Sequence, residues 1–180
     1  MSTPRSRALA NAARTRRDDP EHRVHVRAVA ELRASFVRRG IWSGLKEDAC
    51  PFFHAMNEGD CSHAEAEKRR ALGVSSGVSD LVIVVPMTCG TKAYTDHSGR
   101  HNPALPIRWP GLANEIKAPG GTLSRKQEQW LAFWSRAGFL SKVTTGHRET
   151  AELYAAVGYV ERAAADAWIA WAERCDPGAL

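Results

Sequence analysis

The sequence predicts an α/β protein with a mixed central sheet flanked by helices. Two observations lead to this fold class. Residues 81–85 form an uninterrupted apolar run rich in β-branched side chains, which is typical of a buried central strand. Residues 24–39 instead place most of their apolar side chains on one helical face. Segments of the two kinds alternate along the chain, which favours one sheet with helices packed on it.

The first half of the chain is expected to contain a helix over 24–39, which Gly40 ends. A short apolar segment at 51–56 predicts a strand. Residues 62–72 are rich in Ala, Glu, Lys and Arg, so we expect a helix there, with Gly73 as its stop.

The second half begins with the strand at 81–85, closed by Pro86. Residues 87–111 are rich in Gly and Pro and predict a long connection, which is uncommon in a compact domain unless it is functional or mobile. Ser124 is followed by Gln127 at the third position, which indicates a capping box at a helix start. The further elements expected are strands at 111–117 and 139–144 and helices at 125–137, 147–157 and 162–174.

The basic residues are unevenly distributed. The chain has 25 Lys and Arg against 20 Asp and Glu, a net charge of +5, and five arginines precede the first acidic residue, Asp18. We therefore expect a basic, disordered arm at 1–19, one folded domain at 20–160 and an additional helix at 161–180. The arm either neutralises phosphates or is simply a solvated tail. No apolar run is long enough for a membrane helix and no secretory signal is visible, so a cytoplasmic protein is expected.

Three charged residues carry the chemistry that the sequence predicts. Asp80 lies at the mouth of the buried strand, and Glu115 and Lys117 lie on the next one. Side chains on a strand alternate, so 115 and 117 share a face. Paired carboxylates suit Mg²⁺, which activates water and stabilises charge on a phosphate, and Lys117 would orient that water. Taken singly, Asp80 is also a plausible turn residue, and Glu-x-Lys is common on a solvated strand face.

A zinc site is a weaker interpretation. Cys50, His54, Cys61 and His63 are possible ligands, but their spacing fits no standard zinc knuckle.

Four motifs carry a specific resemblance. They are His54-x-x-Asn57-Glu58-Gly59, Gly73-Val74-x-x-Gly77-Val78-Ser79-Asp80, Glu115-Ile116-Lys117 and Leu123-Ser124-x-x-Gln127. Together they resemble the VRR-NUC family of PD-(D/E)XK nucleases, in its stand-alone phage and bacterial form, over roughly residues 21–159. The resemblance implies a restriction-endonuclease-like fold and a cytoplasmic protein of a bacterium or phage-infected host. Ser79 departs from the family, which usually has Pro before the aspartate, and the segment 87–111 is longer than expected.

The resemblance also implies site residues. Asp80, Glu115 and the backbone carbonyl of Ile116 would hold Mg²⁺, with Mn²⁺ as a substitute. Glu21 is the best match for a further acid on the first helix and Glu31 is the alternative, although an acid at position 21 also suits a helix start. Gln127 would contact the scissile phosphate or water besides capping its helix. DNA contacts are assigned to His54, Asn57, Glu58, Ser124 and Arg125, although the first three could instead frame the metal site and residues 57–60 also read as a polar turn. On the charge argument alone, Arg14, Arg16 and Arg17 of the basic arm are further candidates for DNA contacts.

The predicted function is a Mg²⁺-dependent DNA endonuclease, selective for branched DNA such as Holliday junctions and acting as a homodimer. The alternatives are a flap- or end-acting or non-specific nuclease, and a non-catalytic DNA-binding module of the same fold. Aromatic side chains on two helices are candidates for the dimer interface, although the monomer's own core competes for them. These are Trp130, Phe133 and Trp134 on one helix and Trp168, Ile169 and Trp171 on the other.

Overall fold

The computed structural model describes residues 19–45, 50–53, 78–89, 94–95, 98–99, 101–102 and 107–180. Its centre is a four-stranded sheet in the order β1-β2-β7-β8. The strands are Phe52–Phe53, Leu81–Ile83, Leu112–Lys117 and Leu140–Thr145. The first two pairings are antiparallel, whereas β7 and β8 are parallel, so the sheet is mixed as predicted.

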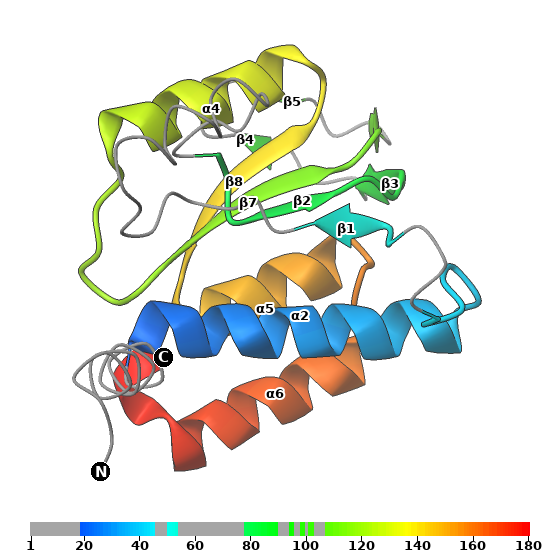
Figure 1. Cartoon of the computed structure of the whole chain (residues 1–180), viewed down its shortest axis with the longest axis vertical. Helices are drawn as coiled ribbons and strands as arrows, with labels where there is room; N and C mark the ends of the chain where they lie inside the picture. Colours follow the sequence, from blue (N-terminus) through cyan, green and yellow to red (C-terminus); the bar gives the residue numbers. More distant parts are fainter. Residues whose placement is uncertain are drawn as a thin grey trace, which may run out of the picture.

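Helices cover both faces of this sheet (Figure 1). Helix α4 (Arg125–Arg136) lies on one face, and α2 (Pro20–Arg38) and α5 (Gly146–Ala156) lie on the other. Helix α6 (Arg162–Cys175) packs on α5, and the short 3₁₀ helix η1 (Pro177–Ala179) follows it. The α/β class and the flanking helices are therefore confirmed. None of the described helices combines the length and the apolar character needed to cross a membrane.

Helix α2 begins earlier than the sequence predicted. Asp19 accepts a hydrogen bond from the backbone N–H of Glu21, and Pro20 occupies the first helical position. Both features stabilise a helix start, because proline lacks only an N–H that would have no partner there. The predicted start at residue 24 marked the first buried side chain, Val24, rather than the first helical residue.

The segment 87–111 contains strands, so the prediction of a plain connection is wrong over its described residues. β3 (Met87–Cys89) pairs antiparallel with β6 (Ile107–Trp109), and β4 (Tyr94–Thr95) with β5 (His101–Asn102). Pairing between distant short segments leaves no local periodicity, and the prolines and glycines favoured a loop. The expected strand at 51–56 is confirmed at Phe52–Phe53, and the expected helix at 62–72 lies outside the described residues.

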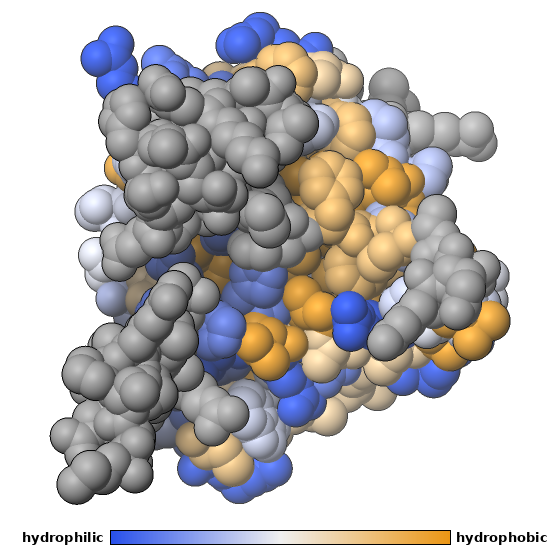
Figure 2. Space-filling model, viewed as in Figure 1, coloured by the Kyte–Doolittle hydropathy of each residue, from blue (hydrophilic) through white to orange (hydrophobic). Residues whose placement is uncertain are grey.

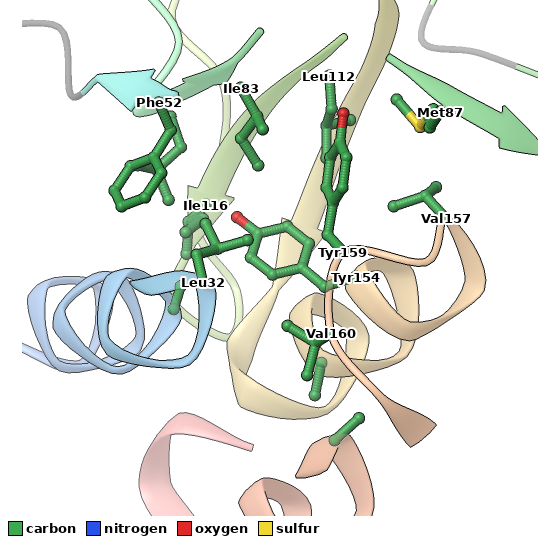
Figure 3. Packing of buried hydrophobic residues seen from close by; sticks show 14 of the residues in the cluster. Leu32, Phe52, Ile83, Met87, Leu112, Ile116, Tyr154, Val157, Tyr159 and Val160 are labelled. Atoms are coloured by element: carbon green, nitrogen blue, oxygen red, sulfur yellow. The ribbon is translucent and has the colours of Figure 1, made fainter. Parts of the chain in front are cut away.

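Strand β7 has two differently used faces. All six of its residues are buried. Leu112 and Ile116 point toward α2 and α5, where they join Leu32, Tyr154 and Tyr159 in the hydrophobic core (Figure 3). Because strand side chains alternate, Ala113, Glu115 and Lys117 point to the opposite face, which α4 covers.

Apolar side chains also reach the surface at the β1 edge of the sheet. Phe53 and Val84 are each nearly half exposed. Figure 2 shows apolar side chains, in orange, gathered over the part of this view where β1 and β2 lie. This edge is distinct from the polar residues at the end of β7.

Gly111 permits the close approach of β2 and the start of β7. A Cβ atom at this position would lie 2.1 Å from the backbone oxygen of Ile83 and 2.7 Å from the Phe139 ring. We predict that Gly111→Ala lowers the free energy of unfolding by about 2 kcal/mol or more, because backbone cannot move aside cheaply. Urea denaturation measures this. Gly178→Ala is the control, since a Cβ there meets nothing within 4 Å. Equal stabilities of the two variants would contradict the packing described for Gly111.

Candidate active site

The register of β2 and β7 brings Asp80 and Glu115 together. Leu81 pairs with Asn114 in this antiparallel ladder. One step further along each strand, Asp80 stands opposite Glu115, and residues opposite each other share a face of the sheet. Asp80, Glu115 and Lys117 are all buried, and Glu115 has no exposed surface. The structure therefore brings together the three charged residues singled out from the sequence.

Glu115 uses its two carboxylate oxygens differently. Oε1 lies 2.9 Å from Lys117 Nζ and also accepts a hydrogen bond from Gln127 Nε2. Oε2 is buried and has no hydrogen-bond partner among the described residues. A buried carboxylate oxygen without a partner is costly, so this atom is a natural ligand for a cation.

The protonation equilibria of the site reflect its burial. Burial raises the pKa of Glu115 to about 7, and the nearby charge of Asp80 adds to that effect, against the opposing influence of Lys117. Burial alone would lower the pKa of Lys117, but Glu115, Glu21 and Asp80 together raise it above its usual value. Lys117 therefore stays an ammonium at neutral pH, whereas Glu115 is only partly ionised there.

Asp80 also organises the backbone of β7. Its Oδ2 accepts a hydrogen bond of 2.8 Å from the N–H of Ile116. This bond follows directly after the last backbone pairing of β2 with β7, so the side chain extends the ladder by one step. Asp80 thereby fixes the peptide group that joins Glu115 to Ile116, and with it the backbone from which Glu115 and Lys117 project.

Gln127 connects the start of α4 to Glu115. Its Oε1 accepts a hydrogen bond from the Ser124 backbone N–H at 2.9 Å, and Ser124 Oγ accepts one from the Gln127 N–H. The predicted capping box is confirmed. Since the backbone N–H of Ser124 fixes Oε1, the amide Nε2 is directed at Glu115. One side chain therefore caps the helix and orients the carboxylate.

The first helix contributes Glu21 rather than Glu31. Glu21 Oε1 lies 3.2 Å from Lys117 Nζ, so Lys117 is shared between Glu21 and Glu115. Glu31 forms an ion pair with Arg27 one turn earlier on the same helix. Of the two alternatives, only Glu21 is in contact with the site residues.

Asn114 lies behind the site and was not identified from the sequence. Its side chain is fully buried on the α5 side of β7. The amide nitrogen donates to Thr144 Oγ1 and to Tyr154 Oη, each at 3.2 Å. Thr150 Oγ1 lies 2.7 Å from the Gly146 carbonyl oxygen, to which it donates, and 2.9 Å from Thr144 Oγ1. This network ties β7 to β8 and α5. A polar residue between Leu112 and Ile116, on the apolar face of the strand, was the available signal for it.

The donor set fits a magnesium ion. Magnesium prefers oxygen ligands and usually takes one or two carboxylates, with water and substrate phosphate completing its shell. Glu115 Oε2 supplies one such atom and Asp80 lies beside it. Within the described parts of the chain, no group of three or more His, Cys, Asp or Glu side chains is placed to hold a metal ion by itself. The Ile116 carbonyl, water and substrate would therefore have to complete the shell of an ion held by Asp80 and Glu115.

Several predicted site residues lie outside the described residues: His54, Asn57, Glu58, Arg14, Arg16 and Arg17. The same holds for His54, Cys61 and His63 of the zinc alternative, while Cys50 is an exposed free thiol. Ser124 and Arg125 are exposed at the start of α4, close in sequence to Gln127.

The aromatic residues divide between surface and core. Phe133 is 45% exposed, and its neighbours Trp130 and Trp134 are half-buried and in ring contact with it. Trp168 has no exposed surface and packs inside the chain, so its prediction as an interface residue is wrong. Trp168 is held inside because its indole N–H donates to His147 Nδ1.

The fold and the buried cluster of Asp80, Glu115 and Lys117 define a restriction-endonuclease-like α/β domain. The sequence profile of the VRR-NUC domain family matches residues 36–148, which is more than half of the chain. The chain therefore belongs to the VRR-NUC family, whose domain has a nuclease-type fold.

A solved structure described as a VRR_NUC domain protein shares 16% sequence identity with this chain, with a TM-score of 0.41. The similarity covers 69% of this chain and 87% of that one. No match was found among curated proteins.

Proposed function

We propose that this protein is a Mg²⁺-dependent DNA endonuclease that hydrolyses phosphodiester bonds, with Mn²⁺ able to replace Mg²⁺. The observation that carries the proposal is the buried Oε2 of Glu115, which has no hydrogen-bond partner among the described residues and lies beside Asp80 and Lys117. Such an arrangement is unstable without a cation and matches what phosphodiester hydrolysis requires. Membership of a nuclease-type family supports the same assignment.

Each residue has a separate task in this mechanism. Asp80, Glu115 and the Ile116 carbonyl would hold the ion, which when bound lowers the pKa of a coordinated water and stabilises charge on the phosphate. Lys117, kept protonated by its acidic neighbours, orients the attacking water and offsets negative charge in the transition state. Gln127 holds Glu115 in one orientation, and Glu21 limits the movement of the Lys117 ammonium.

The preferred substrate is branched DNA, with four-way junctions as the first choice, cut by a homodimer. A two-fold dimer would present two sites to a substrate with approximate two-fold symmetry, which suits paired cuts. The outer side of α4 is the candidate interface, because Phe133 is exposed there between two half-buried tryptophans. Exposed Arg125 and Lys126 at the start of the same helix are candidate contacts to phosphate.

The catalytic assignment is tested with near-isosteric substitutions. We predict that Asp80→Asn, Glu115→Gln and Lys117→Met each lower the cleavage rate about a hundredfold or more, because each removes a charge that acts on the reacting phosphate. Cleavage of labelled linear, flap and four-way DNA in Mg²⁺ or Mn²⁺ measures this, and EDTA should abolish it. Glu128→Gln, an exposed acid on α4, is the control. Near-normal activity of any site variant, or full activity in EDTA, would refute the assignment.

Gln127→Glu separates helix capping from the orientation of Glu115. Glutamate completes a capping box as well as glutamine and suits a helix N-terminus, so we expect helix α4 to be retained, with a lower melting temperature because the new carboxylate faces that of Glu115. A carboxylate cannot donate to Glu115, so cleavage should fall about tenfold or more. Parallel thermal-melting and cleavage measurements check both parts. A variant that melts normally and cuts normally would show that this hydrogen bond has no catalytic role.

Assembly is tested independently of catalysis. We predict a dimer mass by light scattering at micromolar concentration and a monomer for Phe133→Glu, because a buried charge opposes apolar association. Glu128→Gln on the same helix serves as the control. A clean monomer mass for the wild-type protein, free and bound to DNA, would eliminate the dimer and favour a flap- or end-acting enzyme.

A further inference from the structure

The start of α2 and the end of the described chain meet beside the active site. Figure 1 shows the first turn of α2, in dark blue, next to the C-terminal residues, in red. Arg23 on this turn forms a bidentate ion pair with Asp176, the residue that follows α6. The Arg23 Nε–Asp176 Oδ2 and Nη2–Oδ1 distances are 2.8 and 2.7 Å. This contact lies two residues from Glu21, which touches Lys117.

From this juxtaposition we infer that Asp176 is a positioning residue for the active site. Through Arg23 it fixes the first turn of α2 and so holds Glu21 against Lys117. The inference concerns the site of the proposed nuclease and rests on that function for its catalytic part. Neither Asp176 nor Glu21 falls within residues 36–148, where the family profile matches.

Glu21 cannot be held by Lys117 alone. Its side chain is 35% exposed, and ion pairs of exposed groups contribute little to fixing a conformation. Helix ends also fray, and Val24 is the first buried residue of α2 in the described chain. The first turn therefore needs a second attachment to the body of the protein.

Arg23 supplies that attachment from the other side of the helix. Two residues along an α-helix are about 200° apart, so Glu21 and Arg23 point in nearly opposite directions. Lys117 holds the turn on one side and Asp176 holds it on the other. A bidentate contact between arginine and carboxylate also restricts rotation more than a single hydrogen bond does.

Asp176 is itself rigidly placed. It is buried, and its Oδ2 lies 3.1 Å from Nε2 of the fully buried His147. Trp168 donates its indole N–H to His147 Nδ1 at 2.9 Å, so Nδ1 must accept and the ring hydrogen stays on Nε2. His147 therefore donates to Asp176. The hydrogen bond from Arg23, together with that from His147, keeps the pKa of Asp176 below its usual value despite its burial.

A chain of contacts thus leads from the core to the site. It runs from Trp168 through His147, Asp176 and Arg23 to the first turn of α2, and from Glu21 to Lys117. Trp168, His147 and Asp176 are all buried. This series of contacts is therefore rigid, and it fixes the position of Arg23. Asp176 thus adds a buried attachment to the contacts that Val24 and the part-buried Glu21–Lys117 pair give the first turn.

The first experiment measures Lys117 itself, in metal-free protein and without any substrate. Folded wild-type protein and variants are treated briefly with an amine-acylating reagent, and the modification of Lys117 is followed by mass spectrometry. We expect Asp176→Asn and Arg23→Gln each to raise the acylation rate of Lys117 about tenfold. The loss of a charge-assisted hydrogen bond increases by about that factor the population of molecules in which the first turn of α2 has moved away from Lys117. Arg23 is partly exposed, so its variant remains informative even if Asp176→Asn fails to fold.

A matched control removes a different ion pair, one that joins α6 to α5 and does not involve α2. Glu173 on α6 pairs with Arg148 on α5 at 2.7 Å, both about half exposed. Glu173→Gln should leave the modification rate of Lys117 unchanged. Unchanged labelling in the Asp176 and Arg23 variants, or an equal increase in the control, would overturn the inference.

The second experiment is a double-mutant cycle on cleavage. We expect Asp176→Asn to lower kcat about tenfold with Glu21 present, and less than about twofold in the Glu21→Gln background, because residues on one path are not additive. Equal losses in both backgrounds would also overturn the inference. If the protein cuts no DNA, the proposed function fails, while the labelling of Lys117 still tests the positioning.

Discussion

The burial of the Glu115 carboxylate is the constraint on which the rest of the site depends. Moving a charged group out of water costs several kcal/mol of free energy unless protein groups replace its hydration. Lys117 and Gln127 both satisfy Oε1, but the described structure provides nothing for Oε2, and the pKa of Glu115 rises to about 7. The protein therefore holds a carboxylate in a state that a cation would stabilise.

Strand β7 can tolerate this burial because its two faces are used differently. Leu112 and Ile116 belong to the hydrophobic core, whereas Glu115 and Lys117 face α4. Asn114 links the core face to Thr144 on β8 and Tyr154 on α5, so the strand is fixed by hydrogen bonds as well as by packing. Groups mounted on a strand held in this way keep their geometry better than groups on a loop.

Local patterns made the central part of the site predictable. Alternation along a strand placed Glu115 and Lys117 on one face, and the Ser-x-x-Gln pattern predicted the start of α4. The choice between Glu21 and Glu31 was not predictable, because it depends on how α2 packs across the sheet. The pairing of Arg23 with Asp176, 153 residues away, and the burial of Trp168 depend on the same packing. The strands within 87–111 were missed because distant pairings leave no local period.

The structure therefore divides the site into two parts with different origins in the chain. Asp80, Glu115, Lys117 and Gln127 lie within the range matched by the VRR-NUC profile and are fixed by one strand register and one capping box. Glu21 lies outside that range, on a helix whose first turn is held by the C-terminal segment. The inner part can be identified by local rules because neighbouring residues build it. The outer part exists only when the two flanking segments meet, so its geometry is decided by the packing of α2, α5 and α6.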